Sequence, residues 1–261
     1  MSEFADKVFL VTGGSRGIGR AVTVALIERG AAVAACARRA EALEALRRSL
    51  PGDRLLAVRA DVSSPDDLRD FHRAAVERFG RIDGVVSNAG SAVVGPLLEA
   101  PDEEVVFHFH ARVLACIRLC RLAVPTMKVT GGGSIVHIAG AAGVDPTPGL
   151  GIAGVVNAAI QNLSRMMADE LAEHHIRVNA VNPGTLDSEL GAEVMAAFAD
   201  RLGLDVEILQ AEAAASVPLG RMPVPADVAE AVLFFLSPRS AMITGSSLTP
   251  DGGSLIRRLR G

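Results

Sequence analysis

Residues 11–20 have the sequence VTGGSRGIGR and continue directly from the apolar residues 8–10. Glycine permits backbone conformations that other residues avoid, and it lets the chain approach a ligand closely. The residues that follow have the apolar spacing of a helix, and the amide groups at a helix start favour a negatively charged ligand. A strand, a glycine-rich turn and a helix in this order predict a phosphate-binding loop, with a simple tight turn as the alternative for this stretch alone.

The rest of the chain repeats the alternation of apolar strand and amphipathic helix. This alternation predicts an α/β protein with a single Rossmann-type, doubly wound parallel sheet that has helices on both faces. No linker, low-complexity tract or internal repeat interrupts the sequence, so we expect one domain over residues 1–261. Short β-branched runs predict strands at residues 8–12, 32–36, 55–59, 85–87, 134–138 and 176–181.

Composition and charge limit the classes of function. The net charge of −4 gives no basic footprint for nucleic acid or for an anionic membrane. The N-terminal residues MSEFADKVFLVTGG lack the pattern of a signal peptide or a membrane span. The sequence contains three cysteines, a sparse and odd number that favours free thiols over a disulfide framework. We therefore expect a cytoplasmic protein with no nucleic-acid or membrane partner.

Five short motifs resemble the short-chain dehydrogenase/reductase family, and especially its members that are similar to 3-oxoacyl-acyl carrier protein reductases. They are TGGSRGIG at 12–19, DVS at 61–63, SNAG at 87–90, NPG at 182–184 and PDGG at 250–253. The resemblance extends from about residue 7 to residue 253 and implies a nicotinamide dinucleotide site. It assigns Thr12, Gly13, Ser15, Arg16, Gly17, Ile18 and Gly19 to the phosphate loop, Asp61 and Val62 to the adenine, Asn88, Ala89 and Gly90 to the centre, and Pro183 and Gly184 to the nicotinamide face.

The end of the second predicted strand indicates which dinucleotide fits. Family members that prefer NAD usually carry an acidic residue at the position of Ala37, where a carboxylate would repel a 2′-phosphate. Here Arg38 follows directly, and Arg16 lies in the glycine loop. Two guanidinium groups can hold a 2′-phosphate with charge-assisted hydrogen bonds, so we expect NADP(H) in preference to NAD. The alternative is that Arg38 and Arg39 are ordinary solvated charges at a helix start.

The catalytic groups of the family are absent. The resemblance implies a serine, a Tyr-x-x-x-Lys motif and a helical asparagine, and places them at Gly140, Ala153, Asn157 and His110. The chain contains no tyrosine, and its lysines, Lys7 and Lys128, lie far from these positions in the sequence. In the family, the tyrosine protonates the reduced oxygen, and an ammonium about 4 Å away lowers its pKa by roughly three units.

Two residues are candidates to replace this chemistry. His110 is either a general acid near neutral pH or a packing or interface histidine, and Asp145 is either a pocket group or a turn former. We expect His110 and Asn157 to face one another within direct or one-water hydrogen-bond reach, so that the buried positive charge of the lysine is lost. Asn157 would then offer a neutral amide to the nicotinamide ribose. We expect no metal site, because the set His108, His110, Cys116 and Cys120 does not place both imidazoles on one helical face.

The resemblance also implies a substrate lid and a quaternary structure. Residues 188–217 occupy the region that closes over substrate in the family, and their apolar residues indicate a small apolar substrate or none, or else core packing. The helices expected at 102–129 and 151–174, with a C-terminal strand near 246–249, would form a homodimer or homotetramer. The apolar residues of the lid region are Met195, Phe198, Leu202, Leu204 and Leu209.

Three functions are compatible with these features. The first is a cofactor-binding pseudoenzyme, acting as an NADP(H) sensor or as a partner subunit of an active reductase. The second is an NADPH-dependent oxidoreductase for an acceptor that needs little acid help, such as an iminium ion or an enone. The third is a redox-neutral enzyme in which the dinucleotide is structural.

Overall fold

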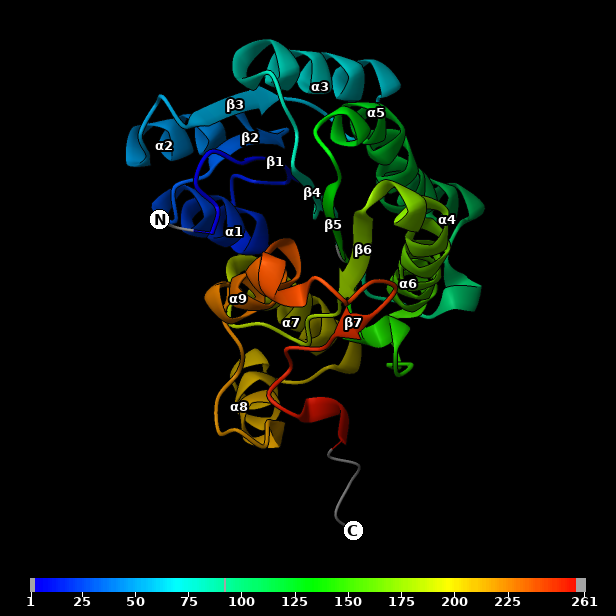
Figure 1. Ribbon diagram of the computed structural model, residues 1–261. Coiled ribbons are helices and arrows are strands. Elements are labelled where there is room, and N and C mark those ends of the chain that lie inside the picture. The colour runs from blue at the N-terminus through cyan, green and yellow to red at the C-terminus, as the bar shows by residue number, and fades with distance from the viewer. Residues whose placement is uncertain (1–2, 92, 257–261) are drawn as a thin grey trace.

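The computed structural model describes residues 3–91 and 93–256, and it contains one sheet of seven strands, all paired in parallel. The strand order is β3-β2-β1-β4-β5-β6-β7. Figure 1 shows helices on both faces of this sheet. The doubly wound fold predicted from the sequence is therefore confirmed. The strands are β1 (Val8–Thr12), β2 (Ala32–Ala37), β3 (Leu55–Arg59), β4 (Gly84–Ser87), β5 (Gly133–Ile138), β6 (Ile176–Val181) and β7 (Ser247–Leu248).

Two layers of helices cover the sheet, and each builds its own apolar core. One core is formed with α1 (Gly17–Glu28), α2 (Ala40–Ser49) and α9 (Pro225–Leu236). The other is formed with α3 (Pro65–Phe79), α5 (Ala115–Val129) and α6 (Gly151–Leu171). Every residue of β1 is buried, as expected of a parallel strand covered on both sides.

Three other helices flank this framework. α4 (Asp102–His108) continues into α5 through a π-helical turn at Phe109–Leu114, so the helix predicted at 102–129 is interrupted by a wider turn. The segment 188–217 forms α7 (Glu189–Leu202) and α8 (Val206–Ser216). Single turns of 3-10 helix lie at Leu97–Glu99, Ala141–Gly143, Ala172–His174, Pro238–Ser240 and Ser254–Ile256.

Local sequence explains where the elements begin and end. α3 starts after Ser64, whose side chain accepts a hydrogen bond from the amide of Asp67, and Pro65 occupies the first turn. It ends at Gly80, which has the left-handed conformation that favours glycine. Because all strands are parallel, the segments that follow β1, β2, β4, β5 and β6 meet at one edge of the sheet. This edge, at the switch of strand order between β1 and β4, is where open α/β sheets place their ligands.

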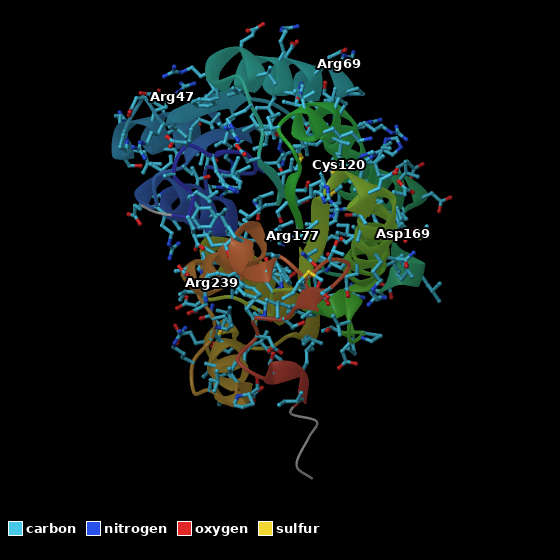
Figure 2. The ribbon with its side chains drawn as sticks, in the orientation of Figure 1. Arg47, Arg69, Cys120, Asp169, Arg177 and Arg239 are labelled. Atoms are coloured by element: carbon cyan, nitrogen blue, oxygen red, sulfur yellow. The ribbon has the colours of Figure 1, made fainter. Side chains whose placement is uncertain are left out.

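One histidine lies in the core between the sheet and the helices. His137 on β5 is fully buried, with Nδ1 2.9 Å from the Ser164 hydroxyl and Nε2 3.7 Å from the Cys120 thiol. Cys120 projects from α5 toward the sheet (Figure 2). The Ser164 hydroxyl donates to the carbonyl oxygen of Ile160, so its lone pair is available to a neutral His137 Nδ1–H. Burial lowers the pKa of His137 from its ordinary 6.5 to about 4.

This lowered pKa predicts a specific loss of stability in acid. The unfolded chain binds a proton at His137 below about pH 6.5, whereas the folded chain does so only near pH 4, so stability falls as the pH drops between these values. From pH 7.5 to pH 5, wild type should lose about 2 kcal/mol more than His137→Gln, measured by urea denaturation. The control variant is His110→Gln, which changes an exposed histidine. It should lose as much unfolding free energy as wild type between pH 7.5 and pH 5. Equal pH dependence in wild type and His137→Gln would contradict the prediction.

Candidate functional site

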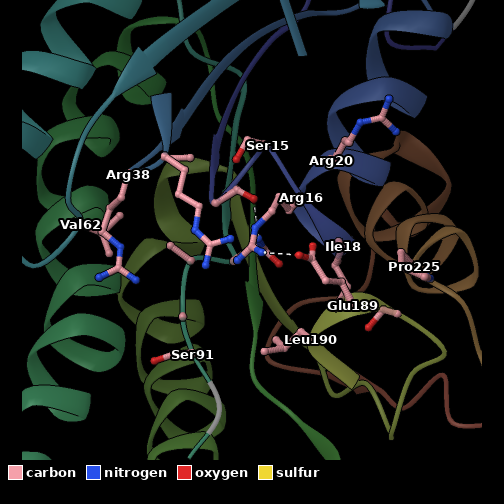
Figure 3. Close-up of a pocket in the computed structure, with 18 of the residues that line it drawn as sticks. Ser15, Arg16, Ile18, Arg20, Arg38, Val62, Ser91, Glu189, Leu190 and Pro225 are labelled. Carbon is pink, nitrogen blue, oxygen red and sulfur yellow. Dashed lines mark hydrogen bonds and ion pairs between the residues drawn. The ribbon is translucent and has the colours of Figure 1, made fainter. Parts of the chain in front are cut away.

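A cavity of about 600 Å³ opens at the carboxyl edge of the sheet, between the glycine loop, the end of β2 and helix α7 (Figure 3). The described residues that line it include most of those that the sequence assigned to a nucleotide. They are Gly13, Ser15, Arg16, Gly17, Ile18, Arg38, Asp61, Val62, Asn88, Ala89 and Gly90. Gly19, Asn157, Pro183 and Gly184 are not part of this lining.

The glycine loop gives the cavity an anion-binding wall. Helix α1 begins at Gly17, and its N-cap residue Arg16 makes no capping hydrogen bond with its side chain, so the first amide groups of the helix lack a side-chain partner. A Cβ atom at Gly19 would lie 2.2 Å from the carbonyl oxygen of Gly13, which explains why this position requires glycine. Gly19 therefore allows α1 to pack closely against the glycine loop. This packing directs the start of α1 toward the cavity.

The segment after β4 is fixed to the glycine loop by hydrogen bonds. The hydroxyl of Thr12 accepts from the amide groups of Asn88 at 2.9 Å and Ala89 at 3.0 Å. The side-chain amide of Asn88 donates in return to the carbonyl oxygen of Thr12 at 2.9 Å. The cavity wall at residues 88–90 is therefore held in place by the loop that follows β1.

Basic side chains surround the outer part of the cavity. Two of them, Arg38 and Arg39, come directly after the last residue of β2, with no acidic residue between. Arg16, Arg20, Arg38 and Arg39 all belong to the lining. Arg16 forms an ion pair of 3.1 Å with Glu189, the first residue of α7, as the dashed line in Figure 3 shows. Both partners are well exposed, so the pair adds little stability and Arg16 can exchange Glu189 for another anion.

These features fit a dinucleotide that carries phosphate groups. Uncapped helix amides and guanidinium groups converge on one cavity, and both prefer anions. After β3, the neighbour of β2, the carboxylate of Asp61 is held by the amide of Ser63 at 2.8 Å and by its hydroxyl at 2.7 Å. The donor set of the described residues is thus suited to phosphate, and the fixed Asp61 is suited to a neutral polar group.

The positions at which the resemblance places the family's serine, tyrosine and lysine lie next to this cavity, at the end of β5 and on α6. The amide of Ala141 donates to the carbonyl oxygen of Pro183 at 2.8 Å, which joins the turn after β5 to the NPG turn. A Cβ atom at Gly140 would lie 2.5 Å from the side-chain nitrogen of Asn157 on α6. Gly140 and Asn157 are therefore brought together, and Ala153 lies one helical turn before Asn157.

The predicted pairing of His110 with Asn157 is wrong. His110 is exposed, and the residue that reaches Asn157 is Arg112. Its Nη2 atom donates to the side-chain oxygen of Asn157 at 3.2 Å and to the carbonyl oxygens of Ile138 at 3.0 Å and Ala139 at 3.2 Å. Asn157 itself is only 6% exposed. The expectation that the site has lost its buried positive charge is wrong as well, because the charge is now on Arg112.

The helix register explains the difference. Cys116, Leu119, Cys120 and Ala123 form the buried face of α5, and Arg112 lies one turn earlier on that face. His110 does not follow this spacing, and the π-helical turn at Phe109–Leu114 rotates the preceding residues further. The buried face was the signal in the sequence that could have identified Arg112.

Arg112 is closely packed as well as hydrogen-bonded. A Cβ atom at Gly90 would lie 2.5 Å from the Cδ atom of Arg112, so the glycine of the SNAG motif provides the room for this side chain. Burial lowers the pKa of the Arg112 guanidinium below its ordinary value. Because a guanidinium remains charged in proteins, Arg112 serves as a fixed cation and not as an acid.

The remaining candidates do not form a second centre. The amide of Asp145 donates to the carbonyl oxygen of Ala141, so the residue belongs to the turn after β5. His108 is buried beside Phe107, with ring centroids 5.4 Å apart. Cys36, Cys116 and Cys120 are free and buried. Within residues 3–91 and 93–256, no group of three or more His, Cys, Asp or Glu side chains is placed to hold a metal ion.

Comparison with known proteins agrees with this architecture. The family model described as enoyl-(acyl carrier protein) reductase matches residues 13–254. The chain belongs to the short-chain dehydrogenase/reductase family. It is 34% identical over 248 residues to a 3-oxoacyl-[acyl-carrier-protein] reductase of Homo sapiens, covering 95% of this chain and 98% of that relative. The resemblance inferred from the motifs is thus confirmed.

Two other relatives of this chain are reductases of small molecules by name. D-erythrulose reductase of Gallus gallus is 35% identical over 256 residues, which cover 97% of each chain. The crystal structure of L-sorbose reductase from Gluconobacter frateurii, complexed with NADPH and L-sorbose, has a TM-score of 0.89 and 32% identity, covering 99% of this chain and 100% of that one. In the part of the chain that the structure describes, no helix has the length and apolar character needed to cross a membrane.

The contact between Gly19 and Gly13 predicts a cost for the smallest substitution. Gly19→Ala places a Cβ atom against backbone, which cannot move aside as a side chain can, so the variant should lose about 1–3 kcal/mol of unfolding free energy in urea denaturation. Gly52→Ala is the control, since a Cβ atom there meets nothing within 4 Å, and it should stay within about 0.5 kcal/mol of wild type. A Gly19→Ala variant as stable as wild type would show that the loop can shift.

Proposed function

We propose that this protein is an NADP(H)-binding member of its family that lacks ordinary ketoreductase activity, and that it acts as a cofactor-responsive sensor or as a partner subunit of an active reductase. One observation carries the proposal: a complete anion-binding cavity adjoins a site whose catalytic positions hold Arg112, Gly140, Ala153 and Asn157. In this proposal the chain binds the dinucleotide but does not use it to reduce ordinary ketones.

The glycine loop, Asp61 and Val62, and residues 88–90 would hold the dinucleotide along the cavity. Pro183 and Gly184 would meet its nicotinamide end, where the turn after β6 packs against Asp251. When bound, the nicotinamide supplies or accepts a hydride. Ala37, Arg38 and Arg16 support a preference for the 2′-phosphate of NADP(H), because Ala37 supplies no carboxylate at the end of β2, Arg38 follows it directly, and Arg16 of the glycine loop lines the same cavity.

The side chains of Arg112, Gly140, Ala153 and Asn157 cannot deliver a proton to a reduced ketone. The chain contains no tyrosine, Lys7 precedes β1 at the opposite edge of the sheet, and Lys128 lies in the last turn of α5. A positioned general acid typically contributes a rate factor of about 10²–10⁴. The exposed His110 and the fixed guanidinium of Arg112 do not replace it.

An oxidoreductase for an activated acceptor, such as an enone, is the second candidate. The observation that favours it is the polar contact between Arg112 and Asn157, which keeps charge and hydrogen-bond donors beside the nicotinamide end of the site. An acceptor that is already electron-poor would need less acid help than a simple ketone. An iminium ion would be repelled by Arg112, so the structure favours the enone over the iminium ion.

The lid and the oligomeric state complete the proposal. Met195 of α7 is buried, whereas Leu202 and Leu204 are exposed, so part of the apolar surface of segment 188–217 is available to a ligand or a partner.

A homodimer or homotetramer is supported by exposed apolar side chains on the helices expected to form the interface. These are Val106 and Phe107 on α4 and Val155 and Met166 on α6.

Nucleotide preference gives a direct test. Titration calorimetry should show tighter binding of NADPH than of NADH, and Arg38→Ala should remove at least tenfold of this preference because it removes one cation from the 2′-phosphate site. Arg48→Ala, on the exposed face of α2, is the matched control and should leave both affinities unchanged. Equal affinity for the two nucleotides in wild type, or an unchanged preference in Arg38→Ala, would falsify the NADP(H) assignment.

The expected lack of ketoreductase activity gives a second test. Wild type should reduce simple ketones and β-ketoacyl thioesters far more slowly than an ordinary enzyme rate of about 1 s⁻¹, measured by NADPH absorbance. The combined variant Arg112→Asn, Gly140→Ser, Ala153→Tyr and Asn157→Lys restores the family's four groups and should gain activity. The same variant with His110→Asn in place of Arg112→Asn should stay inactive, because Arg112 would face the new lysine as a like charge. Ordinary turnover by wild type would refute the proposed function.

A further inference from the structure

We propose that Asn157 presents a hydrogen-bond donor to an acceptor oxygen of a bound small molecule, in the place of the missing serine, and that Arg112 is its positioning residue. The ligand class is a neutral compound with a carbonyl or similar oxygen. The inference rests on the proposed function in one respect, namely that the ligand lies at the nicotinamide end of the nucleotide site.

The orientation of the Asn157 amide is fixed by the chemistry of its partner. Arg112 carries only donors, so the atom of Asn157 that faces it at 3.2 Å must be the oxygen. The reverse orientation would place an NH₂ group against a guanidinium. The Nδ2 atom of Asn157 therefore points away from Arg112.

The Nδ2 atom lies where the family's serine would be. It is 2.5 Å from the position that a Cβ atom at residue 140 would occupy, and no other residue's atom approaches that position more closely. A serine hydroxyl is attached directly to this Cβ. The amide thus fills the space of the absent side chain with another hydrogen-bond donor.

This donor is available to a ligand. Within residues 3–91 and 93–256, no acceptor takes a hydrogen bond from Nδ2, and the atom is not among the side-chain atoms that are both unpaired and fully enclosed. A neighbouring amide pair, formed by Gln161 on α6 and Asn182 after β6, differs in this respect. Asn182 donates to the side-chain oxygen of Gln161 at 3.4 Å, and the remaining polar atoms of that pair are sealed from solvent.

The cation behind the amide sets the ligand class. Arg112 is held by two backbone carbonyl oxygens and packs against Gly90, so it polarises the Asn157 amide from a fixed position. Polarisation strengthens the Nδ2 atom as a donor. The same charge disfavours a cationic ligand. The arrangement therefore selects an uncharged acceptor oxygen over an ammonium group of similar shape.

The test uses acetophenone, an uncharged ketone, with the NADP⁺-loaded protein, because the oxidised cofactor cannot transfer a hydride to the probe. Infrared difference spectra of carbonyl-labelled acetophenone should show a shift to lower wavenumber on binding, and 1-phenylethylamine should bind at least tenfold more weakly. Asn157→Asp keeps the contact with Arg112 and replaces the NH₂ donor with a carboxylate oxygen, which can only accept hydrogen bonds, so it should lose the shift. Arg112→Lys should retain part of the shift, and Arg112→Met should lose it.

Controls separate this inference from the proposed function. Arg48→Ala, on the exposed face of α2, should leave the shift unchanged, and circular dichroism with an NADP⁺ titration confirms that each variant is folded. If Asn157→Asp fails to fold, Asn157→Ala replaces it. No binding of acetophenone to wild type, or an unchanged shift in the folded Asn157 variant, overturns the inference while NADP⁺ still binds. Failure of NADP⁺ to bind overturns the proposed function instead, and the probe titration is then read on the nucleotide-free protein.

Discussion

The Arg112 guanidinium donates to the carbonyl oxygens of Ile138 and Ala139 and to the amide oxygen of Asn157, and this contact joins the end of β5 to α6 and to the helix that precedes α5. A charge enclosed by protein is costly unless its hydrogen bonds are satisfied, so the surrounding groups must keep this arrangement. The absence of a side chain at Gly90 and at Gly140 provides the space for Arg112 and for Asn157. The geometry of the site follows from the placement of this one cation.

The buried positive charge of the site is therefore carried by a different residue from the one that the family resemblance implies. In the family a lysine on α6 supplies a positive charge, and in this chain an arginine one helix away supplies it. The difference matters because a lysine ammonium can lower the pKa of a neighbouring tyrosine, whereas this chain has no tyrosine on which a charge could act. The charge instead contacts the amide oxygen of Asn157, and we propose that this amide binds an oxygen acceptor.

The nucleotide cavity depends on other constraints. Its walls are formed largely by backbone: uncapped amides at the start of α1, the close contact of Gly19 with Gly13, and the hydrogen bonds between Thr12 and residues 88–89. None of these contacts involves the substituted catalytic positions. The contacts that form the cavity are therefore independent of the side chains at Gly140, Ala153 and Asn157.

The sequence by itself determined the sheet, the glycine loop and the absence of a tyrosine, because each depends on residues that are adjacent or regularly spaced in the chain. The predicted strands at 8–12, 55–59 and 176–181 coincide with β1, β3 and β6. Only the tertiary structure decided which helical residue reaches Asn157. A π-helical turn breaks the regular spacing at Phe109–Leu114, and a one-residue change of helix register rotates a side chain by about 100°. Motif alignment therefore placed His110 at the site, whereas packing of the buried face of α5 places Arg112 there.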